Sequence, residues 1–108
     1  MTVHAAASHD ARHLSAELRD QFDTALKTAA ETREQQLAEL PSTHGDLVAT
    51  AHRESVVRIL SEIRSAQERL AAERFGGCEG CGVAIPVARL ELRPWTTLCV
   101  ACALVGRP

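Results

Sequence analysis

The chain has 108 residues and a net charge of -2, from 12 basic and 14 acidic side chains, and its aromatic residues are one Trp and two Phe. A chain this short, with so few large side chains, cannot form a wide globular core and needs an additional stabilising cross-link. The near balance of charge excludes a strong attraction to nucleic acid or to a membrane surface. No run approaches the roughly 18 apolar residues of a membrane span, and the first residues lack the features of a signal peptide, so we expect a cytoplasmic protein.

The composition divides the chain into two parts. Residues 1–75 contain one proline and one glycine, whereas residues 76–108 contain three prolines and five glycines. Helix-breaking residues are therefore concentrated in the last third of the chain. We predict a helical segment over residues 1–75 and a separate module over residues 76–108.

The first predicted helix runs from about Ser8 to Leu40, a stretch without proline or glycine, and Pro41 ends it. Thr32 lies where this helix should face a partner. The apolar residues recur at spacings that suit one helical face. We assign to that face Leu14, Leu18, Phe22, Ala25, Ala29 and Leu40.

Helical spacing resumes over residues 46–74, after the turn-forming segment "PSTHG". Apolar residues here follow a heptad, which is typical of the narrow seam of a coiled coil. They are Ala49, Val56, Ile63 and Leu70, with Ile59 and Ala66 at the intervening position. His52 also falls on the seam, where we expect it to be partly exposed. Because so short a connection makes neighbouring helices antiparallel, we predict a mainly α protein built on an antiparallel coiled-coil hairpin, about 40–48 Å long, with its tip near residues 41–46.

All four cysteines lie in the last third, in two CxxC pairs: Cys78 and Cys81, then Cys99 and Cys102. Zinc takes four tetrahedral ligands, and a CxxC turn brings two thiolates to one ion. The glycines around the first pair suit a tight knuckle. A thioredoxin-like redox pair would need a βαβ setting that the sequence does not show. We predict one structural Zn²⁺ in a small four-cysteine zinc finger, with no open coordination position for catalysis and hence no enzyme activity.

Between the two pairs, Ile85, Val87 and Leu90 are expected to form a short hairpin or strand beneath the metal, with Trp95 covering this small core. The module carries three arginines against two glutamates over residues 76–108, which is too little positive charge for strong phosphate binding. We expect no direct sequence-specific DNA binding.

These features resemble the DksA/TraR family of bacterial regulators, which bind RNA polymerase directly instead of promoter DNA. In the finger the resemblance rests on Phe75-Gly76, Cys78-Glu79-x-Cys81, Ile85, Arg89, Pro94, Cys99 and Cys102. Over residues 8–74 it is a likeness of shape, a long hairpin ahead of the finger. The resemblance implies that the hairpin enters the secondary channel of RNA polymerase and that the finger clamps the two helix ends.

The tip departs from the family pattern. Active members resemble one another in a tip reading Asp-x-x-Asp-x-Ala, which acts near the polymerase active site, whereas this chain reads "PSTHGDLVATA". Asp46 is the one acidic residue of this stretch and is therefore the candidate for acting near the polymerase active site. Thr43-x-x-Asp46 also fits a helix start, in which Thr43 caps the second helix and the carboxylate favours its positive end. Both interpretations of Asp46 stay open.

The family's binding of the alarmone ppGpp uses basic residues near the finger, and Arg93 matches one of them. Ala103 stands where responsive relatives have lysine, and Glu62 occupies the corresponding position on the second helix. Arg93 also fits a solvent-facing arginine or one bonded to the backbone of the zinc site. We therefore expect ppGpp not to bind more tightly when this protein is present.

Two other classes of function remain. A zinc-stabilised interaction adaptor would use the same hairpin on a machine unrelated to transcription, and only the identity of the partner separates it from a polymerase regulator. A thiol redox-sensing switch would release its metal when the cysteines oxidise. For the polymerase regulator, the adaptor and the redox switch alike, we expect the protein to be a monomer.

Overall fold

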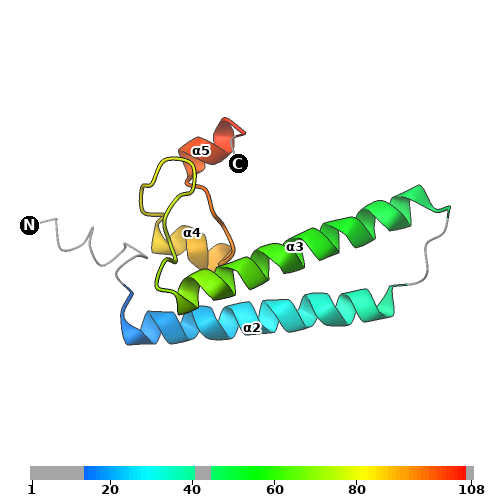
Figure 1. Ribbon diagram of the computed structural model, residues 1–108, viewed down its shortest axis with the longest axis horizontal. Helices are drawn as coiled ribbons and strands as arrows, with labels where there is room; N and C mark the ends of the chain where they lie inside the picture. Colours follow the sequence, from blue (N-terminus) through cyan, green and yellow to red (C-terminus); the bar gives the residue numbers. More distant parts are fainter. Residues whose placement is uncertain (1–13, 41–44, 107–108) are drawn as a thin grey trace, which may run out of the picture.

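The computed structural model describes residues 14–40 and 45–106. Four helices make up the regular structure of these residues: α2 (Ala16–Glu39), α3 (Leu47–Ala71), α4 (Val87–Leu92) and α5 (Val100–Leu104). Figure 1 shows α2 and α3 as an antiparallel pair, with the C-terminal module beside the end of α3. The expected fold class, a long helical hairpin followed by a four-cysteine finger, is confirmed.

The helix α2 begins where its sequence supplies a cap. The Ser15 hydroxyl accepts a hydrogen bond from the backbone N–H of Leu18 at 3.1 Å, and Glu17 places a negative charge in the first turn. The helix ends at Glu39, ahead of Pro41 in the sequence. The predicted start at Ser8 lies outside the described residues. With 24 and 25 residues, α2 and α3 span about 36–38 Å, somewhat less than expected.

Arginines from each helix bond to the carbonyl end of the other. Arg19, near the start of α2, donates to the backbone oxygen of Leu70 at 3.0 Å. Arg53, near the start of α3, donates to the backbone oxygen of Leu37 at 3.5 Å. The last carbonyls of a helix lack partners within it, and a cation there also suits the helix dipole. The antiparallel pairing therefore places a cation at the carbonyl end of each helix.

The seam between α2 and α3 follows the predicted heptad on α3, and on α2 it follows the predicted face except at Ala25. Of the other predicted residues of α2 and its ends, Phe22 is buried and the half-buried ones are Leu14, Leu18, Ala29 and Leu40. On α3 the buried residues are Val56, Ile63, Ala66 and Leu70, and Ala49 and Ile59 are half-buried. On α2 they are Phe22, Leu26 and Ala30, at steps of four.

Two seam assignments on α2 need correction. Ala25 is exposed, and Leu26, which the prediction omitted, is fully buried. Thr32 is exposed. On α3, His52 is exposed and lies 3.5 Å from the side-chain amide of Gln36 across the seam. The reason is that the base of α2 packs against the finger as well as α3, so two partners decide which of its sides is buried. A single heptad seam describes only the contact with α3.

The core beneath the cysteines is part extended and part helical. The backbone N–H of Ile85 donates to the oxygen of Gly76 at 2.7 Å, as in the predicted hairpin, whereas Val87 and Leu90 lie on α4, contrary to that prediction. Ile85 and Leu90 are fully buried, and Val87 nearly so. Pro86, with φ -58, precedes α4, and an i, i+3 pair then places Val87 and Leu90 on one side of that helix. Extended backbone pairs in an isolated antiparallel bridge, Gly77 with Ala84.

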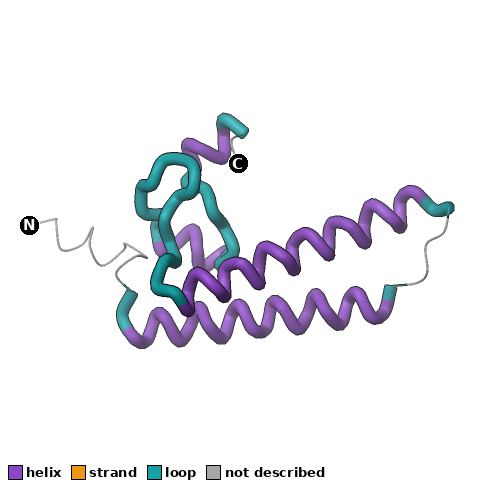
Figure 2. Tube along the Cα trace, in the orientation of Figure 1, coloured by secondary structure: helices purple, strands orange, loops and turns teal. Residues whose placement is uncertain are grey.

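Phe75 joins the finger to the hairpin. It is buried, and its ring centroid lies 5.2 Å from that of Phe22 on α2. One continuous core thus runs from the base of the hairpin into the finger. Figure 2 shows that mainly loops surround α4 and α5 in this module. The division at residues 75 and 76 stays a prediction.

Within residues 14–40 and 45–106, no helix is both long enough and apolar enough to cross a membrane.

Candidate metal centre

The fold brings the two cysteine pairs together from separate segments. Cys78 and Cys81 lie in the loop after α3, and Cys99 and Cys102 lie at the start of α5. Cys99 is the N-cap of α5, and its sulfur accepts from the backbone N–H of Cys102 at 3.5 Å. A CxxC pair at a helix start therefore turns both thiols to the same side.

The four sulfurs fit one tetrahedral ion. All four Sγ atoms lie within 4.8 Å of one another, and those of Cys81 and Cys99 are 3.8 Å apart. A tetrahedron of sulfurs about 2.3 Å from zinc has edges of about 3.8 Å. Four thiolates and no oxygen donor favour zinc over calcium or magnesium. The residues present thus suit the zinc predicted from the sequence.

Backbone amides point at the sulfurs. Cys78 is buried, and its Sγ accepts from the N–H of Gly80 at 3.3 Å and from that of Cys99 at 3.2 Å. The N–H of Cys99 lowers the pKa of the Cys78 thiol to about 6, against the opposing effect of burial. Hydrogen bonding, first to Cys78, raises the pKa of Cys102 to about 12. The site therefore stabilises one thiolate by itself, and metal binding must displace the remaining thiol protons.

Two glycines of the first pair are required for different reasons. A Cβ at Gly80 would lie 2.9 Å from the Sγ of Cys102, so a side chain there would push on a metal ligand. Gly82 has φ +82, a conformation that L-residues rarely adopt. The sequence argument attributed the glycines to backbone conformation, and at Gly80 the reason is close approach instead.

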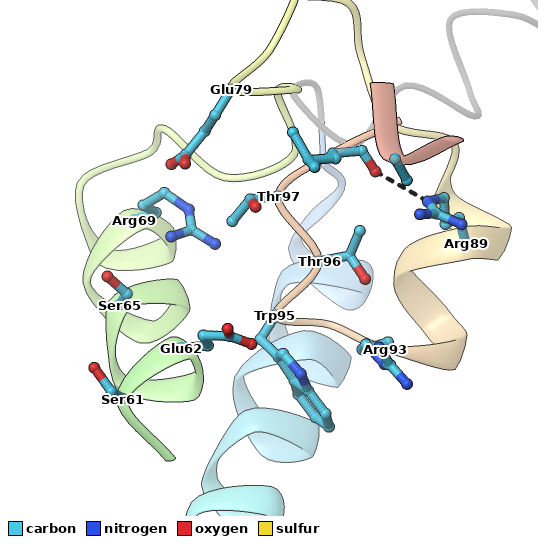
Figure 3. Close-up of a pocket in the computed structure, with 12 residues that line it drawn as sticks. Ser61, Glu62, Ser65, Arg69, Glu79, Arg89, Arg93, Trp95, Thr96 and Thr97 are labelled. Atoms are coloured by element: carbon cyan, nitrogen blue, oxygen red, sulfur yellow. Dashed lines mark hydrogen bonds between the residues drawn. The ribbon is translucent and has the colours of Figure 1, made fainter. Parts of the chain in front are cut away.

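The three positions compared with alarmone-binding relatives meet in one hollow. Glu62 on α3, Arg93 after α4 and Ala103 on α5 line a hollow of about 390 Å³ between the hairpin and the finger (Figure 3). Arg93 is exposed, and it is Arg89 that bonds the backbone near the cysteines, through Nε to the oxygen of Leu98 at 3.0 Å.

The hollow also holds acidic groups close to its arginines. Burial lowers the pKa of Arg69, and the charge of Glu79 opposes that shift. Figure 3 shows Glu79 above Arg69, and Glu62 on the Arg93 side of α3. A polyphosphate in this hollow would meet both signs of charge.

Asp46 is a helix cap, in a different way from the one predicted. It is the N-cap of α3, and its Oδ1 accepts from the backbone N–H of Ala49 at 3.0 Å. The sequence argument placed Asp46 inside the first turn, with Thr43 as cap. The helix begins three residues later than that, and Thr43 lies outside the described residues. Asp46 is exposed at the tip, so its carboxylate is accessible to a partner even while it caps the helix.

Two contacts between separate segments were not predicted from the sequence. The guanidinium of Arg33 on α2 lies over the Trp95 ring, with 5.9 Å from Cζ to the ring centroid. Glu34 on α2 and Arg64 on α3 form an ion pair across the hairpin. Within α2, Asp23 and Lys27 form an ion pair at i, i+4 spacing, at 3.0 Å. Helical spacing identifies pairs within one helix, whereas pairs between segments depend on how the segments pack.

Known proteins with a similar sequence match this chain over part of its length. Residues 73–104 match the family model described as the prokaryotic DksA/TraR C4-type zinc finger. The RNA polymerase-binding transcription factor DksA of Escherichia coli K12 is 40% identical over 45 residues, which are 42% of this chain and 30% of that protein. An uncharacterized protein of Aquifex aeolicus is 43% identical over 47 residues, covering 44% and 32%. The matched segments thus span less than a third of these relatives.

Solved structures match over nearly the whole chain. The transcription factor DksA2 of Pseudomonas aeruginosa aligns with a TM-score of 0.63 and 26% identity, covering 98% of this chain and 95% of that one. The RNA polymerase binding protein and transcriptional regulator Dks of Chlamydia trachomatis aligns with a TM-score of 0.59 and 25% identity, covering 86% and 91%. The relatives with assigned roles are thus named as transcription factors or regulators and not as enzymes.

Proposed function

Because this chain belongs to the DksA/TraR family of C4-type zinc-finger proteins, we propose that it binds bacterial RNA polymerase directly and regulates transcription. The likeness in fold to DksA2 over the whole chain carries this proposal, since it extends beyond the finger to the hairpin. The protein acts as a monomer in the cytoplasm, catalyses no reaction and reads no DNA sequence itself.

The hairpin is the working part of the proposed regulator. It is a rod of two helices that leaves the finger at one end, a shape suited to entering a narrow channel (Figure 1). We propose that it enters the secondary channel of the polymerase and brings Asp46, exposed at the tip, towards the active site. A carboxylate there would disturb the field around the catalytic metal ions.

Zinc would clamp the base of this rod. Cys78, Cys81, Cys99 and Cys102 would hold it, and the ion would supply the folding free energy that so small a module lacks. The finger core is continuous with Phe22 on α2, so a folded finger fixes the helix ends.

Binding and cross-linking test the proposal. Purified protein should bind bacterial RNA polymerase saturably, and a photo-crosslinker at the exposed Val48 should label residues inside the secondary channel. The same group at Leu104, exposed on α5, is the matched control and should label the outer surface. Polymerase that shows no saturable binding would favour an adaptor for another machine, and tip labelling outside the channel would refute insertion.

A thiol redox switch is the second candidate, favoured by the exposure of Cys81 and its 3.8 Å separation from the sulfur of Cys99. A peroxide would join these two thiols in a disulfide and be reduced to water. Mild peroxide should then release zinc, and a thiol reductant with added zinc should restore it. Retention of zinc under these conditions would eliminate this candidate.

A further inference from the structure

The finger contacts α2 at two separated places. Phe22 packs against Phe75, and further along the helix Arg33 lies over the ring of Trp95. Residues 22 and 33 are about 16 Å apart along a helix axis. The first contact decides where the finger sits on the hairpin. A second contact at that distance also decides how the finger is oriented.

Trp95 is suited to such a contact. Its side chain is half-buried against the shared core, and Figure 3 shows its ring extending over α2. A guanidinium within about 6 Å of an aromatic centroid is attracted by the ring, and Trp is the strongest partner. Arg33 is itself half-buried, so water weakens this attraction less than at a fully exposed site.

Trp95 begins the segment that carries the second cysteine pair. Further hydrogen bonds along residues 95–99 hold this segment, and the following four come from the finger itself. The N–H of Thr96 donates to the oxygen of Arg93 at 3.0 Å, and the carbonyl oxygens of Thr97 and Leu98 accept hydrogen bonds at 2.8 and 3.0 Å. The N–H of Cys99 donates to the Sγ of Cys78 at 3.2 Å. Among these five named contacts, the one at Trp95 links the segment to the hairpin.

We infer that Arg33 is a positioning residue for the metal centre: through Trp95 it seats the segment that delivers Cys99 to zinc. Arg33 touches no sulfur, so its effect on zinc passes through the ring. Coupling between two equilibria is reciprocal, so zinc also favours the seating of Trp95 on α2. The hairpin and the metal centre then stabilise each other, whatever partner the hairpin has.

Zinc affinity and tryptophan fluorescence test this inference in reduced, full-length protein. Arg33→Ala should weaken zinc affinity about two- to fivefold, measured by competition with a chelator of known affinity. Trp95 is the single tryptophan, so its emission should shift to longer wavelength in the same variant. Arg33→Lys keeps a cation and should recover part of both effects. Arg58→Ala, at an exposed arginine of α3, is the matched control and should change neither.

A double-variant cycle separates positioning from general destabilisation. In a Trp95→Ala background, Arg33→Ala should weaken zinc no further, because its route to the metal is already removed. Removing zinc should shift Trp95 emission in the parent protein, and less so in Arg33→Ala. Unchanged zinc affinity in Arg33→Ala would overturn the inference, whether or not the emission moves. An additive loss in the double variant would also overturn it, because Arg33 would then act by another route.

Discussion

At the base of the hairpin, Phe22, Leu26, Ile63 and Leu70 are buried against one another and against the finger, whereas at the tip Leu47 and Val48 are 85% and 82% exposed. Cross-helix hydrogen bonds follow the same gradient. Arg19 bonds the end of α3 at 3.0 Å, but near the tip the contacts of Arg53 with Leu37 and of Gln36 with His52 are both longer, at 3.5 Å. One pair of helices is thus held firmly at one end and loosely at the other.

The difference in burial between the base and the tip suggests that the two ends of the hairpin have different roles. The base has apolar burial and, with zinc, a metal cross-link, which are the large stabilising terms for a small chain. The tip has helix capping and solvated side chains, which contribute little. Changes at the base should therefore act mainly on stability, and changes at the tip mainly on the proposed action on polymerase.

The largest effect is expected from the metal. Cys99→Ser removes one predicted ligand, and the apparent binding free energy of a structural zinc site is about 10–16 kcal/mol. We expect loss of tightly bound zinc and a lower melting temperature of the helices, measured by metal analysis and circular dichroism. Helices that melt unchanged after zinc loss would show that the finger and the hairpin base are independent.

The next largest effect is expected in the seam of the base. Ile63 is fully buried, so Ile63→Ala should lower the free energy of unfolding by about 2–5 kcal/mol. Val57 lies on the same helix but is about half exposed, and Val57→Ala is the control, with a change of about 0.5 kcal/mol or less. Denaturant titrations measure both. Equal losses in the two variants would contradict the seam described for α3.

A smaller effect on stability is expected at the tip, where two substitutions of Asp46 separate its two roles. Asn caps a helix about as well as Asp, so Asp46→Asn should leave stability unchanged, while Asp46→Ala should lose about 0.5–2 kcal/mol. We expect the lower part of that range, because the tip buries little. Melting curves measure this difference.

Transcription assays on the same two variants address the charge. If the carboxylate acts on polymerase, both variants should lose regulation equally while still binding polymerase. If Asp46→Asn regulates like the parent, the carboxylate serves only as a cap, and regulation comes from the hairpin occupying the channel.

The smallest effect is expected for ppGpp. Of the compared positions in the hollow, Arg93 alone is basic, and Glu62 and Ala103 supply no cation for phosphate. The affinity of the polymerase complex for ppGpp should therefore be the same with and without this protein. An increase that disappears in Arg93→Ala would contradict this prediction and assign the hollow to the alarmone.

The hairpin was predictable because the spacing of apolar residues along the chain follows the helical period. On α3 the spacing of Val56, Ile63 and Leu70 identifies the buried side, and the structure confirms it. On α2 the same reasoning chose Ala25 over Leu26, because it considered one partner where there are two. Periodicity shows that a helix has a buried side, but the number and direction of its neighbours decide which side that is.

The grouping of the cysteines was predictable for a chemical reason. Two CxxC pairs have few uses in a short chain other than a zinc site, and the structure brings their sulfurs within reach of one ion. The helix beneath them was not predicted, because short apolar runs such as Ile85 to Leu90 suit a strand or a helix equally well. In the structure the run is divided: Ile85 follows the bridge of Gly77 with Ala84 in extended backbone, and the helix begins after Pro86.

By itself the sequence determined the hairpin and the set of four cysteines, because each depends on the kind and spacing of residues along the chain. Only the tertiary structure decided that Asp46 caps α3, that Gly80 makes room for Cys102, and that Arg33 meets Trp95. Arg33 and Trp95 are far apart in the chain and share no periodic pattern. Their contact exists because the finger folds back onto α2, and such a juxtaposition follows from packing rather than from local sequence.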